Sequence, residues 1–469
     1  MILAIDQGTT GTTCLIVDER LRVRGRGYRE LRQRFPRPGW VEQDPEELQA
    51  GVLAAAEAAL ADAGLRPEAL AAVGVANQRE TTVLWERSSG RPVAPAIVWQ
   101  DRRTAARCRE LPSELIRTRT GLVPDPYFSA TKLEWLLARA GRPAEELAFG
   151  TVDAWLASRL AGRHVTDRTN ASRTLLYGLA AEAWDDELLA LFGVPRTVLP
   201  RVVGSAEVVG DAALLGARLP LAALAGDQQA ALAGHGCFAP GEAKATYGTG
   251  SFVLAHAGAA LEPPPPGLLA TAAAPAGYAL EGAVLTSGAA VQWLRDGLGL
   301  VGSAAETEAL ARSVDSSDGV VFVPALTGLG SPHWEPDARG LLAGVTRGTT
   351  RAHVVRATLE AIAFQIADVV DALPLGLHAL RADGGASANG FLMQFQADLL
   401  GLPVEVAREQ ETTALGAAAL AGLALGLWSP PDVRGLLGTG TVYEPTLSRD
   451  EAETLREGWR LAMRRVLVR

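Results

Sequence analysis

An aspartate and a glycine–threonine turn lie near the middle of the chain in a pattern suited to phosphoryl transfer. Asp227 follows a short apolar run at residues 219–226, and the sequence YGTGSF follows at residues 247–252. An aspartate at the end of a buried strand projects into the crevice where open α/β sheets bind ligands, and such a turn offers backbone N–H groups and a hydroxyl to a phosphate. Together they predict a carboxylate that accepts a hydroxyl proton beside a bound phosphate donor. The alternative is that Asp227 only caps a helix beginning at Gln228.

A second carboxylate precedes a threonine-rich turn at the start of the chain. Asp6 ends an apolar run at residues 2–6, and the turn GTTGTT at residues 8–13 separates it from another apolar run at 14–18. This arrangement favours Mg²⁺ on Asp6, directly or through water, with phosphate on the N–H groups and hydroxyls of Thr10, Gly11 and Thr12. The alternative is an ordinary hairpin turn with a capping aspartate.

Residues that suit a polyol follow two further apolar runs. Arg79 and Glu80 come after residues 71–76 and would offer donors and acceptors to hydroxyl groups; the alternative is a surface ion pair that contributes little. Trp99 ends the run at 94–99 and would cover a ligand's carbon face, or else belong to the core. Tyr127, in the turn DPYF, would present its phenol to the ligand, or else pack within a loop.

Two glycine-containing segments would contact a nucleotide base. Gly385 and Asn389 follow the apolar run at 379–383 and open a predicted helix. Glycine lets a flat base approach the backbone, and Asn389 would hydrogen-bond to the edge of the base. Gly288 and Gln292, at the start of another predicted helix, would line the other side of the nucleotide.

Length, charge and lysine usage narrow the class of protein. At 469 residues the chain exceeds what one hydrophobic core usually supports, which predicts two domains. A net charge of −9 argues against a nucleic-acid partner. Among 44 lysine and arginine residues, lysine occurs only at positions 132 and 244, and no GxxxxGK[ST] sequence is present. A Walker-type nucleotide site is therefore excluded.

Cysteine usage and hydropathy predict a cytoplasmic protein. Cys14, Cys108 and Cys237 are widely spaced and form no CxxC pair, which fits a reducing compartment. The first residues, MILAIDQG, are too few and too uncharged for a signal peptide. The longest apolar stretch, residues 414–428, falls short of the roughly 20 residues that a membrane span needs. We expect a packed core helix there and no membrane span.

The apolar pattern of the first half recurs in the second. The first half predicts strands at 2–6, 14–18, 23–31, 71–76 and 94–99, and helices at 46–63, 102–110 and 129–140. The second half predicts strands at 243–247, 251–256, 277–281, 319–324, 379–383 and 403–406, and helices at 287–298, 350–372, 388–400 and 412–426. Each half opens with two strands that flank a glycine–threonine turn. This predicts a duplicated α/β domain with a nucleotide between the halves.

Ordered segments over nearly the whole chain resemble the FGGY carbohydrate kinases, and among them the members that act on glycerol. The segments are PGWVEQDP (38–45), NQRETT (77–82), AIVWQDRRT (96–104), DPYFSATKLEW (125–135), TDRTNASRT (166–174), AGDQQAAL (225–232), YGTGSF (247–252), VQWLRD (291–296), GLLAGVTRGTTRAHVVRATLE (340–360) and DGGASANGFLMQFQ (383–396). NQRE, WQxRR and DPYF point to glycerol over other polyols.

The resemblance implies an α/β fold of two ribonuclease-H-like (actin-like ATPase) domains with an active-site cleft between them. Residues 1–229 would bind glycerol and residues 230–469 would bind ATP. The implied reaction is the ATP-dependent phosphorylation of glycerol to sn-glycerol 3-phosphate, with Mg²⁺, in glycerol catabolism. The implied assembly is a homo-oligomer, either a dimer or a tetramer.

The resemblance also assigns residues to roles. Asp227 would be the general base and Asp6 the Mg²⁺ partner. Glycerol would contact Arg79, Glu80, Trp99, Tyr127, Asp227, Gln228 and Phe252. ATP would contact Thr10, Gly11, Thr12, Thr249, Gly288, Gln292, Gly385 and Asn389. Thr13 stands where the glycerol-specific pattern has an arginine, so Mg²⁺ or another arginine must compensate the phosphate charge there.

Two other functions fit parts of this pattern. An FGGY kinase for another polyol or ketose would share the fold and the base. A non-catalytic, actin-like sugar sensor or scaffold would keep the fold but is expected to lose the base or to add a DNA-binding segment. Asp227 is present, which favours a catalytic protein.

Overall fold

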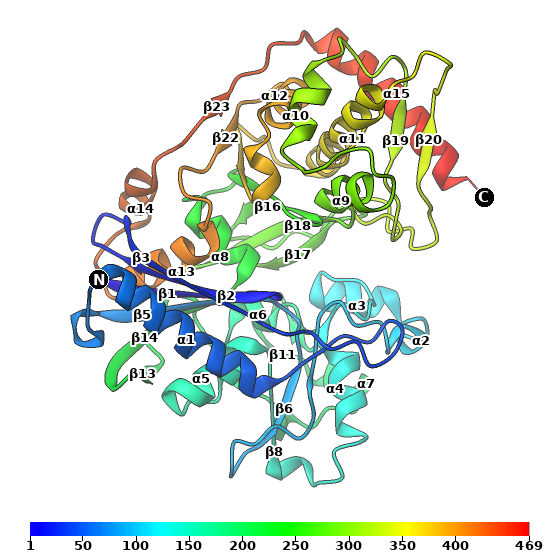
Figure 1. The fold of residues 1–469 in the computed structure, drawn as a ribbon. Helices are drawn as coiled ribbons and strands as arrows, with labels where there is room; N and C mark the ends of the chain where they lie inside the picture. The colour runs from blue at the N-terminus through cyan, green and yellow to red at the C-terminus, as the bar shows by residue number, and fades with distance from the viewer. Residues whose placement is uncertain (469) are drawn as a thin grey trace.

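Two β-sheets with the same strand order form the centres of the two halves of the protein (Figure 1). The computed structural model describes residues 1–468. In spatial order, the first sheet contains β13 (Gly210–Leu214), β14 (Ala217–Gly226), β5 (Ala72–Asn77), β1 (Ile2–Gln7), β2 (Gly11–Val17) and β3 (Val23–Glu30). The second sheet contains β23 (Val442–Tyr443), β22 (Val404–Val406), β21 (Leu380–Asp383), β15 (Ala243–Tyr247), β16 (Ser251–Gly258), β18 (Tyr278–Val284) and β17 (Leu269–Ala272).

The strand directions of the two sheets also match. β1 is antiparallel to β2 and parallel to β5, and β15 is likewise antiparallel to β16 and parallel to β21. β14 and β22 extend the sheets in parallel, and β13 and β23 close that edge antiparallel. β3 and β18 pair antiparallel on the opposite side. The predicted duplication is confirmed, and each half has the strand pattern of a ribonuclease-H-like domain.

Helix α1 (Pro45–Ala63) packs against β2 and β3, and the sequence explains both of its ends. Asp44 caps the first turn by accepting a hydrogen bond from the backbone N–H of Glu46, and Gly64 ends the helix with a φ of 64°. On β3, a Cβ atom at Gly27 would lie 2.0 Å from the carbonyl oxygen of Ala55. Only glycine therefore lets the helix lie this close to the strand.

Two helices that lie between the sheets connect the halves (Figure 1). α8 (Asp227–Gly234) follows β14, and α13 (Thr412–Ala424) packs on both α8 and the first sheet although it comes late in the chain. α13 is the core helix predicted within residues 412–426, and most of its side chains are buried. Within residues 1–468, no helix combines the length and apolar character needed to cross a membrane.

The chain between β5 and β13 forms an insertion that packs onto the second sheet. Its elements are β6 (Val83–Glu86), β7 (Ala96–Ile97), α2 (Ala105–Cys108), α3 (Ser113–Thr120), α4 (Ser129–Leu137), β8 (Leu147–Gly150), α5 (Val152–Ala161), β9 (Val165–Asp167), α6 (Arg168–Ala171), β10 (Tyr177–Gly178), β11 (Ala183–Trp184), α7 (Asp186–Leu191) and β12 (Arg201–Val203). Leu84 and Phe128 of the insertion share one hydrophobic cluster with Leu269 and Leu280 of the second sheet.

The remaining helices of the second half include three that were predicted, at 287–298, 350–372 and 388–400, and three that the sequence pattern did not indicate. They are α9 (Gly288–Asp296), α10 (Glu306–Arg312), α11 (Arg351–Ala372), α12 (Gly390–Leu400), α14 (Pro430–Leu437) and α15 (Arg449–Leu467), with the hairpin β19 (Val321–Val323) and β20 (Leu341–Ala343). In the first half, the strand predicted at 94–99 is reduced to β7, which pairs with β4 (Glu42–Gln43). Pro95, directly before β7, has no N–H group and so cannot donate a hydrogen bond to a neighbouring strand. The helix predicted at 102–110 is likewise reduced to α2.

The crossing of α8 and α13 gives a stability prediction. A Cβ atom at Gly416 would lie 1.8 Å from the carbonyl oxygen of Ala230, so Gly416→Ala must push the two helices apart. We expect a loss of about 1–3 kcal/mol in the free energy of unfolding, measured by chemical denaturation. Gly458→Ala, in the exposed interior of α15 with open space around it, is the matched control. It should raise stability by roughly 0.5–1 kcal/mol; equal effects of the two changes would contradict the close crossing.

Candidate active site

Three neighbouring strands of the first sheet end at the predicted catalytic residues. Asp227 directly follows the last residue of β14, and Arg79 and Glu80 follow the end of β5. In the register of the sheet, Gly226 lies beside Asn77, and Asp6 on β1 lies beside Ala76. Because these strands are parallel, their carboxyl ends meet at one edge, and the predicted base, polyol residues and Mg²⁺ partner gather there.

The carboxylate of Asp227 is held by a buried arginine. Its Oδ1 lies 3.2 Å from Nε of Arg79 and accepts a hydrogen bond of 2.7 Å from the backbone N–H of Gln228. The Asp227 side chain is 29% exposed, whereas that of Arg79 is 2% exposed. The carboxylate of Asp227 is therefore held by Arg79 and remains partly accessible to solvent.

Arg79 belongs to a buried cluster of two arginines and two glutamates. Its guanidinium donates to Glu281 of β18 at 2.5 and 3.1 Å, so the pair joins the two halves of the protein. Arg173 donates to Glu80 at 2.6 Å and to Glu281 at 3.1 Å. All four side chains are at most 2% exposed. Two positive and two negative charges balance in this cluster, which is the condition for burying ions without a prohibitive desolvation cost.

The electrostatics of the two glutamates differ. Burial raises the pKa of Glu80, and Arg173 and Arg79 offset only part of that effect. Burial would also raise the pKa of Glu281, but Arg173 and Arg79 overcome it and hold this pKa at about 2. Glu80 also has a φ of 61°, which is strained for a residue with a side chain. Such strain tends to occur at functional positions that the surrounding structure holds in place.

The aromatic residues predicted to flank a polyol come from both halves. Trp99 donates its indole N–H to Oγ1 of Thr9 at 2.8 Å, and its ring meets the edge of Tyr127 with 5.4 Å between centroids. The hydroxyl of Tyr127 accepts a hydrogen bond of 3.3 Å from Arg79. Phe252, on β16, is half-buried and packs against a small cluster that contains Leu232 of α8.

Gln228 is buried, and its side chain is tied to a lysine of the second sheet. Lys244 Nζ donates to Oε1 of Gln228 and, at 2.7 Å, to Oγ1 of Thr246. Burial lowers the pKa of Lys244 to about 8, although Asp383 and Asp227 act in the opposite direction. The other lysine, Lys132, is also fully buried and donates to two backbone carbonyl groups.

The first threonine turn presents only some of its predicted groups to solvent. Thr10 is exposed, whereas Gly11 is buried and a Cβ atom there would lie 2.4 Å from the Tyr28 hydroxyl. Thr12 is buried, and its hydroxyl donates to Gln7 at 2.8 Å. The structure therefore gives Gly11 and Thr12 packing roles in the hairpin and leaves Thr10 at the surface.

Three of the predicted nucleotide residues lie around the second glycine–threonine turn. Thr249 and Gln292 are exposed, and Gly288 donates its N–H to the carbonyl of Gly248 at 2.9 Å. A Cβ atom at Gly288 would lie 2.6 Å from that same carbonyl oxygen. Glycine at this position thus allows α9 to begin directly on the turn.

The other two predicted nucleotide residues follow β21. Gly385 is exposed, with open space where a Cβ atom would be. Asn389 caps α12 by accepting from the N–H of Leu392 at 3.0 Å and donates to Thr307 at 3.1 Å. Gly384, with a φ of 85°, packs against the carbonyl of Tyr247 at the end of β15. This contact places the Gly385 segment beside the second glycine–threonine turn.

Asp6 has the environment of a cation ligand. Its Oδ1 atom is buried without a hydrogen-bond partner among the described residues. Burial raises the pKa of Asp6 well above its ordinary value, and the carboxylates of Asp227 and Glu411 raise it further. A nearby cation would relieve both effects.

Several residues of this site were missed by sequence reasoning. Glu281 is the only charged residue in the strand sequence YALEGAV, and Lys244 is one of two lysines in the chain. Each is a charged residue within an apolar segment, and this isolation was the sequence feature that could have indicated a buried, functional charge. Arg173 lies within the segment TDRTNASRT, but nothing in its local sequence indicates that it meets Glu80 and Glu281.

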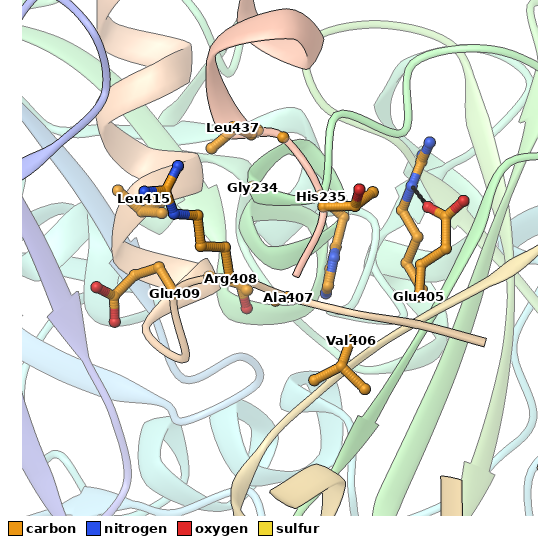
Figure 2. Close-up of a pocket in the computed structure, with 13 residues that line it drawn as sticks. Gly234, His235, Glu405, Val406, Ala407, Arg408, Glu409, Leu415 and Leu437 are labelled. Atoms are coloured by element: carbon orange, nitrogen blue, oxygen red, sulfur yellow. Dashed lines mark hydrogen bonds and ion pairs between the residues drawn. The ribbon is translucent and has the colours of Figure 1, made fainter. Parts of the chain in front are cut away.

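A small polar pocket lies at the other end of α8 from Asp227 (Figure 2). Figure 2 shows Glu405 on one side of it and Arg408 and Glu409 on the other, with His235 between them. Its volume of about 30 Å³ holds water molecules but neither a polyol nor a nucleotide. We therefore do not place the reaction there.

Comparison with known proteins decides the family. Models of the N-terminal and C-terminal domains of the FGGY family of carbohydrate kinases match residues 1–234 and 243–425. A glycerol kinase of Deinococcus radiodurans is 50% identical, over 99% of this chain and 97% of the relative. The chain belongs to the FGGY family of carbohydrate kinases. Glycerol kinase 2 of Thermotoga maritima is 49% identical to this FGGY kinase, over 99% of this chain and 98% of the relative.

Solved structures share the fold of this FGGY kinase. A crystal structure of Plasmodium falciparum glycerol kinase with ADP has a TM-score of 0.93 and 33% identity, covering 100% of this chain and 98% of that chain. A xylulose kinase from Rhodospirillum rubrum has a TM-score of 0.85 and 26% identity, covering 98% and 97%. The predicted family, kinase class and two-domain α/β fold are confirmed.

The charge cluster gives a stability prediction. Glu281→Gln removes one of the two fully buried carboxylates that balance Arg79 and Arg173, and we expect a loss of about 3–5 kcal/mol in the free energy of unfolding at neutral pH. The pKa of Glu281 is about 2 in the folded protein against 4.5 for an ordinary glutamate. Its stabilising contribution is therefore present above pH 4.5 and declines as the pH falls toward 2.

Denaturation of wild type and variant should accordingly converge as the solution is acidified below about pH 5. Glu187→Gln, which breaks an exposed pair with Arg119, is the control and should cost at most about 1 kcal/mol. Wild-type stability of the Glu281→Gln protein at neutral pH would contradict the balanced cluster.

Proposed function

We propose that this FGGY kinase transfers the γ-phosphate of ATP to glycerol, giving sn-glycerol 3-phosphate and ADP, with Asp227 as the general base. The observation that carries the residue assignment is the setting of Asp227: a partly exposed carboxylate, 3.2 Å from a buried arginine, where three parallel strands end. Relatives that are named glycerol kinases and match over nearly the whole chain support the substrate.

The reaction follows from this placement. Asp227 orients one terminal hydroxyl of glycerol, whose oxygen forms a bond to the γ-phosphorus while the bond to the departing ADP oxygen breaks. The hydroxyl proton passes late to Asp227, because phosphoryl-transfer transition states are loose. Alignment of the hydroxyl with the phosphate therefore contributes more than proton abstraction itself.

Glycerol would replace the longer hydrogen bonds that residues of the site make with one another. Arg79 makes its longest hydrogen bonds, 3.3 Å each, to Gln229 and Tyr127. We expect a substrate hydroxyl to compete for these donors, whereas the bonds to Glu281 persist. The other proposed contacts are Glu80, Trp99, Asp227, Gln228 and Phe252. Buried charged groups would reject a ligand without matching hydroxyls, because they would lose partners.

ATP is proposed to lie at the carboxyl ends of β15 and β21. Thr249, Gln292 and Gly385 are exposed there and free to meet a ligand. Gly288 and Asn389 would act by shaping this surface, since both already make bonds within the protein. From the first half, Thr10 would reach the phosphates, and Gly11 and Thr12 would hold the turn that carries it.

The residues present fit a Mg²⁺ ion beside the phosphates. Mg²⁺ in phosphoryl-transfer sites is usually bound by one or two carboxylates, phosphate oxygens and water. The partnerless buried oxygen of Asp6 meets that need, and residues 1–468 contain no cluster of three or more metal-ligating side chains. When bound, the ion would neutralise phosphate charge, which Thr13 cannot do in place of an arginine.

The remaining parts of the proposal concern organisation and location. We place glycerol binding in residues 1–229 and ATP binding in residues 230–469, with α13 packed on the first sheet from the second part. All three cysteines are free and buried, which supports a cytoplasmic location. A homo-oligomer, dimer or tetramer, is part of the proposal and is tested by light scattering of the purified protein.

The base assignment predicts the behaviour of Asp227→Asn. We expect kcat for glycerol phosphorylation to fall by at least about 100-fold, while glycerol binding measured by calorimetry stays detectable. The assay is ADP release with and without glycerol. Asp315→Asn, at an exposed position outside the site, should behave as wild type. Full activity of Asp227→Asn would refute the base, and ADP release with a pentulose but not with glycerol would favour another FGGY substrate.

The metal assignment predicts opposite effects on stability and activity at Asp6. Asp6→Asn removes a buried carboxylate that repels Asp227, so thermal stability without ligands should not fall and is expected to rise. The Mg²⁺ concentration needed for half-maximal rate should increase at least about tenfold, because a charged ligand is lost. An unchanged Mg²⁺ dependence would contradict the role of Asp6.

A further inference from the structure

A buried polar network lies behind the strand ends that carry the active site. It is built on β9 and α6, within the segment TDRTNASRT, and none of its side chains has a role in the proposed reaction. Its central residues are Asp167, Thr169 and Asn170, which are all 0% exposed. The network contacts β5 and β14 at the last residue of each strand.

Asp167 orients the other two side chains. Its Oδ2 accepts from the N–H of Thr169 at 2.9 Å, from Oγ1 of Thr169 at 2.7 Å and from Oγ of Ser205 at 2.6 Å. Its Oδ1 accepts from the N–H and the side-chain amide of Asn170 at 2.9 and 2.8 Å. With five donors on one carboxylate, the hydroxyl of Thr169 and the amide of Asn170 each have a single orientation available.

One arm of the network reaches the strand that precedes the base. The hydroxyl of Thr169 donates its hydrogen bond to Asp167, so its oxygen is available only as an acceptor. This oxygen accepts a hydrogen bond of 2.8 Å from the backbone N–H of Gly226. Gly226 is the last residue of β14 and the residue directly before Asp227. This hydrogen bond therefore fixes the peptide from which the carboxylate of Asp227 projects.

The other arm reaches the strand that precedes the polyol residues. The side-chain amides of Asn170 and Asn77 exchange two hydrogen bonds of 3.0 Å, and Asn77 also donates to the carbonyl of Gln78 at 2.8 Å. Asn77 is the last residue of β5, and Arg79 follows two residues later. The register of the sheet places Asn77 beside Gly226, so both arms end at one point.

We propose that Thr169 and Asn170 are positioning residues that set the Asp227 carboxylate and the Arg79 guanidinium relative to each other. The inference rests on the proposed function of Asp227 and Arg79. Arg79 Nε and Asp227 Oδ1 lie 3.2 Å apart and follow the ends of two separate strands. The network is a buried connection between those two strand ends. A displacement of a reacting group by about 1 Å can lower the rate roughly 100-fold. We therefore expect the position that these hydrogen bonds give to the two groups to affect turnover.

The two arms predict different kinetic defects. Thr169→Val keeps the shape of the side chain but removes the acceptor for Gly226, and we expect kcat to fall about 10- to 100-fold with the glycerol KM changed less than about threefold. Asn170→Ala removes the partner of Asn77, and we expect the glycerol KM to rise about tenfold or more with a smaller change in kcat. Both are measured by steady-state ADP release with wild type in parallel.

Two further variants separate positioning from stability. Thr169→Ser retains the hydroxyl and should restore kcat to within about threefold of wild type. Ser205→Ala removes a hydrogen bond to the same Asp167 oxygen, while the bond from the N–H of Leu224 on β14 goes to the Ser205 backbone and is kept. This variant should therefore lower the thermal midpoint with little change in kcat or KM. If Thr169→Val does not fold, the split between Asn170→Ala and Ser205→Ala decides the question.

The proposal is overturned if Thr169→Val keeps wild-type kcat, if Thr169→Ser is as impaired as Thr169→Val, or if all the variants lower kcat and raise KM in proportion to their loss of stability. Failure of the proposed function is distinguishable from these outcomes. In that case the wild-type protein itself would release no ADP with glycerol.

Discussion

The buried pairing of Arg79 with Glu281 is the interaction on which the arrangement of the site depends. It brings a positive charge from the end of β5 against a negative charge in the middle of β18, and thus joins the first half to the second inside the protein. The same guanidinium lies 3.2 Å from the carboxylate of Asp227, so the position of the proposed base depends on both halves together. Arg173 supplies the second positive charge that makes burial of Glu80 and Glu281 tolerable.

The duplicated sheets explain why such a site can form. In each half, parallel strands deliver their carboxyl ends to one edge, and α8 and α13 lie between the sheets with almost no space at their crossing. The first sheet brings carboxylates to its edge, and the second brings turns rich in glycine to its own. Such a pairing of carboxylates from one sheet with glycine turns from the other is consistent with the proposed reaction, which needs an acceptor and a phosphate donor held in line.

Much of this arrangement was predictable from sequence, because short apolar runs ending in Asp, Gly or Thr indicate strands and their functional ends. The runs before Asp6, Arg79, Asp227 and Gly385 are strands β1, β5, β14 and β21 in the structure. The repeated pattern of the two halves was also sufficient to predict the duplication. The FGGY resemblance then assigned expected roles to individual residues that the pattern left open.

The sequence could not predict contacts between side chains that lie far apart in the chain. Arg79 meets Glu281, and Lys244 meets Gln228, across the boundary between the halves, where no local pattern links them. The sequence also did not indicate that Thr12 and Asn389 hold hydrogen bonds within the hairpin and at the start of α12. Their contact with a nucleotide stays a prediction. The strand predicted at 94–99 is limited to Ala96–Ile97, and apolar composition alone gave neither of its ends.

The burial of both lysines has a consequence for the outer surface of the folded protein. Lys132 and Lys244 are the only lysines in the chain, and neither side chain is exposed. Every basic side chain at the surface is therefore an arginine or a histidine, and guanidinium groups keep their charge even in strongly alkaline solution. Acylating agents that target amines, including acetyl donors, find no lysine to modify while the fold is intact. The cationic part of the surface is consequently closed to regulation by lysine acetylation.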